Sequence, residues 1–235
     1  MPELPEVETT TRGLQKTITG LVIKDAWTDL STKDKRQRDT IANPKYFSVF
    51  KKEILNKKIL LVERRAKNIL INLGGASRLR QGFGEPKKTI LVHMKMTGHL
   101  LYGEYKKGPI NRFIHFTITF TNGEKLYFSD MRKFGKITLL PTKTAHCTKH
   151  LNNIGPEPLD KNFTIVKFKE RLKKSKNGKI KTILMNQSVI AGIGNIYSDE
   201  ILWRTGVHPE RKVFSLKEKE LKLIFNAIKQ TLKKG

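Results

Sequence analysis

The sequence has very little cysteine, and it has no long apolar run. Cys147 is the only cysteine among 235 residues, so neither an internal disulfide nor a cysteine-based zinc cluster is available within this sequence. No window approaches the roughly 18 apolar residues that a membrane-spanning helix needs, and no signal peptide opens the chain. We therefore expect a soluble, cytoplasmic protein that has no membrane association.

Acidic residues are also scarce. The sequence has 47 Lys and Arg residues against 21 Asp and Glu residues, which gives a formal net charge of +26. A domain with so much charge of one sign repels itself unless a polyanion neutralises it. An acidic membrane surface or an acidic protein could also neutralise this charge, but nucleic acid is the expected partner.

Residues 1–150 combine one helical segment with a long stretch of period two. Helical spacing of the apolar residues predicts a short helix over Glu3–Ile18. Alternation and β-branched residues then predict strands at Leu21–Trp27, Ile59–Glu63, Ile69–Leu73, Thr89–Met96, Phe113–Phe120 and Ile137–Leu140. Thr121, Asn122 and Gly123 are typical of a hairpin turn. We expect an antiparallel β-sandwich or barrel, interrupted by surface loops at Ser31–Thr40 and Gly74–Lys88.

Residues 151–235 change to helical spacing after the segment Gly155–Pro158. The expected helices are Val166–Leu172, Ile180–Met185, Ile196–Trp203 and a last helix through Leu221–Leu232. Ser215 and Glu218 fit a capping box at the start of the last helix. The fold class is therefore α+β, with a β-sandwich domain at 1–150, a helical domain at 151–235 and a ligand cleft expected between them.

The first residues of the chain offer nucleophilic chemistry. Removal of Met1 would expose the secondary amine of Pro2, and α-amines have a pKa near about 8, so a usable fraction is unprotonated at neutral pH. Such an amine can form an iminium at an aldehydic carbon. Glu3 is suited to protonate a leaving oxygen, and Glu6 to shuttle protons or orient the amine. The alternative is that both acids only favour a helix N-terminus.

Six segments together resemble the formamidopyrimidine-DNA glycosylase family. They are MPELPEVET at 1–9, RRAKN at 64–68, HMKMTG at 93–98, SDMRKFG at 129–135, GPEP at 155–158 and GIGNIY at 192–197. The last segment lacks the third glycine of a dinucleotide-binding loop, and in the family it belongs to a helix–two-turn–helix element. Its glycine N–H groups and Asn195 are suited to approach a phosphate.

The resemblance implies a role for each matching residue. Pro2, Glu3, Glu6 and Lys67 would be catalytic, and His93, Asn195 and Tyr197 would contact DNA. Met96, Arg132 and Phe134 would fill the space that an extruded nucleotide leaves. Without the family resemblance, Lys67 would be interpreted as a solvated surface charge and His93 as a hydrogen-bonded structural residue. Met96 and Phe134 would be interpreted as core residues.

The implied activity is base excision repair of duplex DNA. A monomeric, bifunctional glycosylase and abasic-site lyase would flip out oxidised purines such as 8-oxoguanine and formamidopyrimidines. It would excise them through a Schiff base at Pro2, followed by β/δ-elimination. Leu4 and the Arg132/Phe134 arrangement favour this activity over an endonuclease VIII-like enzyme for oxidised pyrimidines. A catalytically weak module that binds lesions or abasic sites is the second alternative.

One family feature has no counterpart in the sequence. Family members normally continue past the position of Gly235 into a zinc finger with four cysteines or a zincless substitute for it. A truncated fragment without a cofactor is therefore expected, and zinc would be expected only if that region follows. We expect such a fragment to react with abasic DNA but to excise oxidised guanine poorly.

Overall fold

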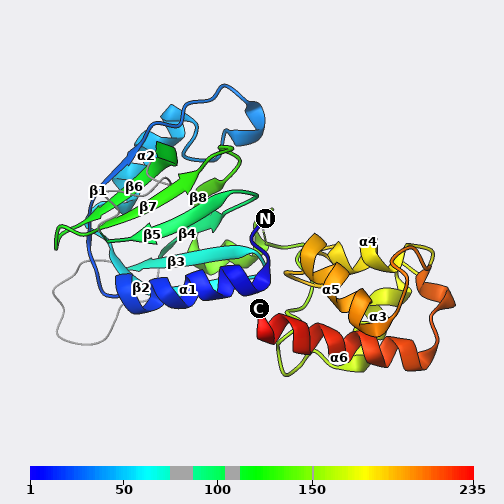
Figure 1. Ribbon diagram of the computed structural model, residues 1–235. Coiled ribbons are helices and arrows are strands. Elements are labelled where there is room, and N and C mark those ends of the chain that lie inside the picture. Colours follow the sequence, from blue (N-terminus) through cyan, green and yellow to red (C-terminus); the bar gives the residue numbers. More distant parts are fainter. Residues whose placement is uncertain (75–86, 104–111, 150) are drawn as a thin grey trace. The chain divides into compact units, whose positions relative to one another are not determined.

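The computed structural model describes residues 1–74, 87–103, 112–149 and 151–235, which form two compact units (Figure 1). The β unit consists of Met1–Pro2, Val7–Arg64 and Asn68–Thr148. The helical unit consists of Glu3–Glu6, Arg65–Lys67 and Lys149–Gly235. Two short segments of the N-terminal half therefore belong, by their contacts, to the helical unit.

Eight strands within the described residues form two four-stranded antiparallel sheets in the β unit. One sheet has the order β1-β6-β7-β5, from β1 (Ile23–Thr28), β6 (Ile114–Phe120), β7 (Lys125–Asp130) and β5 (Gly98–Tyr102). The other has the order β2-β3-β4-β8, from β2 (Lys58–Arg65), β3 (Asn68–Gly74), β4 (Lys88–His93) and β8 (Lys136–Pro141). The expected α+β class and the antiparallel sandwich are confirmed.

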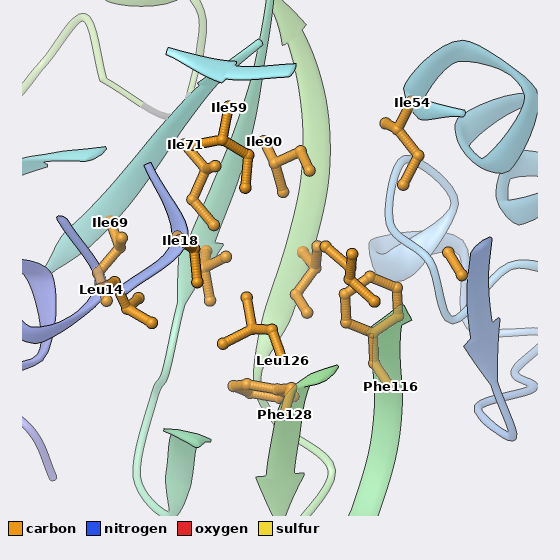
Figure 2. Close-up of a cluster of buried hydrophobic side chains, with 14 of the residues drawn as sticks. Leu14, Ile18, Ile54, Ile59, Ile69, Ile71, Ile90, Phe116, Leu126 and Phe128 are labelled. Carbon is orange, nitrogen blue, oxygen red and sulfur yellow. The ribbon is translucent and has the colours of Figure 1, made fainter. Parts of the chain in front are cut away.

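Apolar side chains from both sheets meet in one core. Phe116 and Phe128 come from the first sheet, and Ile69 and Ile71 from the second (Figure 2). Because side chains alternate between the faces of a strand, residues two apart along each strand point into this core. Helix α1 (Leu4–Ile18) adds Leu14 and Ile18, which lie beside Ile69 in Figure 2.

The predicted hairpin at residues 121–123 joins β6 and β7. Gly123 has φ +89°, and the N–H of Phe120 donates to the oxygen of Glu124 at 2.9 Å. Glycine adopts this left-handed conformation without the steric cost that other residues have. The hairpin is therefore confirmed, and it fixes the register of the two central strands of the sheet.

Helix α2 (Pro44–Ile54) is an element that the periodicity did not reveal, as are strands β5 and β7. The Asn43 side chain accepts hydrogen bonds from the N–H groups of Lys45 and Tyr46, and Pro44 occupies the first turn. Both are helix-start signals. The expected loop at 31–40 contains the short 3₁₀ helix η1 (Lys35–Gln37), and most of the expected loop at 74–88 lies outside the described residues.

The helical unit is built on four α-helices within the described residues. They are α3 (Ile165–Lys173), α4 (Ile180–Met185), α5 (Asn195–Thr205) and α6 (Glu218–Lys234), with the 3₁₀ helix η4 (Val213–Ser215) before α6. A further 3₁₀ helix, η3 (Thr142–Cys147), follows β8 in the β unit. Gly206, with φ +64°, ends α5. Within the described ranges, every helix is too short or too polar to cross a membrane.

The start of α6 corrects one expectation. The capping pair is not Ser215 and Glu218, because η4 and Leu216 occupy the residues before the helix. The N–H of Lys217 instead donates to the Glu220 carboxylate at 2.7 Å, and the Ser215 hydroxyl donates to the oxygen of Lys212. The capping carboxylate therefore lies two residues later than predicted.

Helix α3 provides a test of the helical core. Phe168 is fully buried and lies 5.7 Å from the Phe225 ring, whereas Val166 on the same helix is 60% exposed. We expect Phe168→Ala to lower the free energy of unfolding by about 3–5 kcal/mol, because it leaves a cavity. Val166→Ala should change it by less than about 0.5 kcal/mol. Urea unfolding followed by circular dichroism checks this, and equal midpoints for the two variants would contradict the packing.

Candidate active site

The carboxylate of Glu3 lies at the N-terminus of α5. Its side chain is 1% exposed and accepts hydrogen bonds from the N–H groups of Gly194 (2.6 Å), Ile196 (2.9 Å) and Tyr197 (3.4 Å). The first N–H groups of a helix have no partner within the helix, and the helix dipole favours negative charge there. The glycine segment at residues 192–194 was expected to bind a phosphate through its N–H groups. In the structure, the N–H of Gly194 donates to the Glu3 carboxylate of the same chain.

Gly194 allows this approach. A Cβ atom there would lie 2.5 Å from Cδ of Glu3 and 2.6 Å from Nζ of Lys67. Real Cβ atoms do not come so close to other heavy atoms, so a side chain at this position would displace one of the two groups. The same observation places the Lys67 amine and the Glu3 carboxylate around one backbone position.

Lys67 is buried beside these acids and is not a solvated surface charge. Its side chain is 6% exposed. Burial lowers the pKa of the Lys67 amine below its ordinary value, and the negative charges of Glu3 and Glu6 oppose this effect. A buried amine with a lowered pKa beside two carboxylates is more typical of an active site than of a lysine on the protein surface.

Glu6 is held by two donors. Its Oε2 atom accepts from the N–H of Glu3 at 2.9 Å, and its Oε1 atom accepts from the Tyr197 hydroxyl at 2.7 Å. Burial and the bond to Glu6 raise the pKa of Tyr197. Tyr197 was expected to contact DNA, and that role stays a prediction. The structure gives its hydroxyl another partner, the Glu6 carboxylate.

Pro2 directly precedes this group of acids. It is partly exposed, and Met1 before it is exposed. In the full sequence the Pro2 nitrogen is an amide, so the nucleophilic amine expected at this position exists only after Met1 is removed.

A second group of predicted residues gathers in the β unit. The Arg132 guanidinium lies 4.7 Å from the centre of the Phe134 ring and donates to the sulfur of Met96 at 3.1 Å. Met96 is 46% exposed and Phe134 47% exposed, so neither is the core residue that the alternative interpretation required. A hollow of about 480 Å³ beside them is lined by Asp34, Arg36, Gln37, Lys95, Met96, Phe134 and Lys136.

Asp130, which sequence reasoning missed, organises this second group. Its buried carboxylate accepts from the Thr97 hydroxyl and from the N–H groups of Arg132 (3.2 Å) and Gly135 (2.7 Å). It therefore joins the loop of Met96 to the loop of Arg132. An aspartate that accepts from the N–H two residues later is a local turn signal. The bond to Thr97 has no local signal.

The other two predicted residues lie at the edges of the two groups. His93 ends β4, and its Nδ1 atom accepts from the N–H of Lys95 at 3.1 Å, in the turn that leads to Met96. Asn195 is the exposed first residue of α5, while Gly194 is the cap. In the described ranges, no three His, Cys, Asp or Glu side chains are arranged to hold a metal ion.

The chain matches two family profiles. Residues 1–137 match the formamidopyrimidine-DNA glycosylase N-terminal domain, and residues 154–235 match the formamidopyrimidine-DNA glycosylase H2TH domain. A relative from Pelotomaculum thermopropionicum named formamidopyrimidine-DNA glycosylase is 39% identical over 100% of this chain and 78% of its own length. A relative of the same name from Ligilactobacillus salivarius is 36% identical over 95% of this chain and 73% of its own.

A solved structure shows the same fold. The Lactococcus lactis Fpg protein, in complex with DNA containing N7-benzyl-Fapy-dG, superposes with a TM-score of 0.82 at 32% identity. The match covers 99% of this chain and 78% of the other. The likeness therefore extends over both units.

The charges around Lys67 lead to a titration prediction. The pKa of Lys67 should lie below its ordinary value of 10.5, because burial disfavours the ammonium. Glu6→Gln should lower it further, since it removes a negative charge that favours the ammonium. Glu8→Gln is the control, because the Glu8 carboxylate pairs with Arg64 and Arg12. An NMR titration of the Lys67 side chain measures both, and an unchanged midpoint in Glu6→Gln would contradict the proximity.

Proposed function

The chain belongs to the formamidopyrimidine-DNA glycosylase family of DNA-repair enzymes, and on that premise we propose that it is a bifunctional glycosylase and abasic-site lyase for oxidised purines. DNA glycosylase activity and DNA binding follow from the family. The lyase step and the choice of 8-oxoguanine and formamidopyrimidines are the proposal. The observation that carries it is that the Glu3 carboxylate and the Lys67 amine both lie against Gly194. Glu3 is the residue that directly follows Pro2 in the sequence.

The proposed reaction begins with the free Pro2 amine attacking C1′ of the damaged nucleotide. The bond between C1′ and the base breaks, and the base leaves with the electron pair. The Glu3 carboxylate, which three N–H donors hold in place, takes the proton that the attacking amine loses. It then delivers this proton to O4′ as the C1′–O4′ bond breaks, and C1′ and Pro2 are left joined as an iminium.

The iminium makes the lyase step possible. It withdraws electrons from C2′, so a C2′ proton is lost and the 3′ phosphate leaves by β-elimination. Loss of a further proton expels the 5′ phosphate by δ-elimination, and water then hydrolyses the iminium and restores the amine. Glu6, which is held by Tyr197 and by the Glu3 N–H, is placed to relay these protons.

Lys67 and the second group of residues serve substrate binding in this proposal. Lys67 would contact the phosphate next to the reacting sugar, where its charge stabilises the departing anion. Arg132, Phe134 and Met96 are exposed and contact one another, which supports their insertion into the duplex beside a flipped nucleotide. His93 and Asn195 would contact neighbouring phosphates.

Removal of Met1 should be required for the reaction. An amide nitrogen has no basic lone pair with which to form an iminium. Borohydride trapping on abasic duplex DNA should therefore give a covalent adduct with protein processed to Pro2 and none with protein that retains Met1. Processed Pro2→Gly protein is the matched control, because it keeps an α-amine and should still be trapped, though more slowly. Equal trapping with and without Met1 would sink the assignment of Pro2.

Replacement of Arg132 tests the role of the second group. Arg132→Ala should weaken binding to a lesion-containing duplex by about 1–3 kcal/mol, the scale of a good bidentate contact to a base. Lys125→Ala is the charge control, because Lys125 is exposed at the start of β7. Fluorescence anisotropy gives both dissociation constants. The same small loss in both variants would mean that Arg132 acts only as one more positive charge.

A further inference from the structure

We propose that Glu157 is a positioning residue that sets the place of the Lys67 amine, an inference that rests on the proposed function. Glu157 belongs to the segment Gly155–Pro158, which marks the predicted boundary between the two domains and contributes to the family resemblance, but no role was predicted for Glu157. Its Oε1 atom accepts from the N–H of Ala66 at 2.6 Å and from Nη1 of Arg65 at 2.8 Å. One carboxylate oxygen therefore holds the two residues that precede Lys67.

The turn that carries Lys67 needs such a partner. Ala66 has φ +53°, in the left-handed region, which is strained for a non-glycine residue. It is also buried, and its N–H donates to Glu157, so loss of this carboxylate removes a buried hydrogen bond. A strained residue persists only where its surroundings determine its conformation. The hydrogen bond to Glu157 holds Ala66 in this conformation, and Ala66 directly precedes Lys67.

The segment that carries Glu157 is itself firmly held. Nη2 of Arg65 donates to the oxygens of Ile154 (2.9 Å) and Gly155 (2.7 Å), and the N–H of Gly155 donates to the oxygen of Gln187 at 2.8 Å. A Cβ atom at Gly155 would lie 2.7 Å from the oxygen of Ser188. The segment therefore lies directly against the turn at residues 187–189.

The same turn also positions Glu3. The side chain of Gln187 accepts from the N–H of Gly192 at 2.8 Å and donates to the oxygen of Ile193 at 2.6 Å. The next residue, Gly194, holds the Glu3 carboxylate. Glu157 and Gln187 thus connect the turn that carries Lys67 to the loop that holds Glu3, and together they fix the spacing of the two reacting groups.

Loss of Glu157 should therefore affect chemistry more than binding. The turn would relax away from φ +53°, and the Lys67 amine would leave its place beside Glu3. Displacement of a reacting group by about 1 Å can cost roughly a hundredfold in rate. The affinity for DNA should change little, because the rest of a chain with net charge +26 is untouched.

The experiment compares processed wild-type protein with the Glu157→Ala, Glu157→Gln and Glu8→Ala variants. Glu157→Gln keeps an oxygen that accepts from Ala66. Glu8→Ala is the matched control, because it removes a similarly buried ion pair, Glu8 with Arg64, at 2.7 Å. Single-turnover excision, borohydride trapping, dissociation constants for lesion DNA and the NMR titration of Lys67 are measured for each.

We expect Glu157→Ala to lower the excision rate about ten- to a hundredfold, Glu157→Gln to lower it less, and Glu8→Ala to leave it unchanged. The dissociation constants should agree within about twofold, since few phosphate contacts change. The titration midpoint of Lys67 should shift only in the Glu157 variants. Equal rates in Glu157→Ala and Glu8→Ala, or a loss of affinity that matches the loss of rate, would overturn the inference. An inactive wild type would instead refute the proposed function, and the Lys67 midpoint alone would then decide the role of Glu157.

Discussion

The bond between the Glu3 carboxylate and the N-terminus of α5 is the interaction on which the candidate active site depends. A carboxylate that is 1% exposed would be costly without compensation, and three N–H donors with the Lys67 ammonium nearby supply it. The same bond satisfies donors that the helix leaves without partners. Because Glu3 follows Pro2 directly, this bond holds the residue next to the proposed nucleophile.

This interaction explains why residues 3–6 belong to the helical unit although the rest of α1 belongs to the β unit. Residues 65–67 are held in the helical unit by the bonds of Arg65 and Ala66 to Glu157. Each segment is short, and side-chain to backbone bonds hold both of them, while Leu4 also packs into the core of the helical unit. Glu3, Glu6 and Lys67 are thus gathered in the helical unit, whereas Pro2 belongs to the β unit. The residues proposed to open the duplex are also in the β unit, on two loops that Asp130 joins. The two tasks are organised by two buried carboxylates, Glu3 and Asp130, which bind backbone N–H groups.

Particular residues show where prediction from sequence succeeded and where it failed. Period two predicted the sandwich, because an antiparallel sheet with one face in a core must alternate. Helix α2 was missed because Tyr46, Phe47 and Phe50 have the composition of a strand, and the Asn43 cap was overlooked. The bonds of Asp130 to Thr97 and of Tyr197 to Glu6 join residues 33 and 191 positions apart, and no local pattern encodes such a pairing.

The charge of the site differs from that of the chain around it. Lysine and arginine outnumber the acidic residues in the chain as a whole, yet the amine of Lys67 has two carboxylates, Glu3 and Glu6, as neighbours. In the free protein, Glu3 and Glu6 oppose the effect of burial and help to keep this amine protonated. On the proposed assignment a DNA phosphate then arrives as a further negative neighbour, and it favours the same charged form. That charge is the one that, on the proposed assignment, stabilises the phosphate as it leaves.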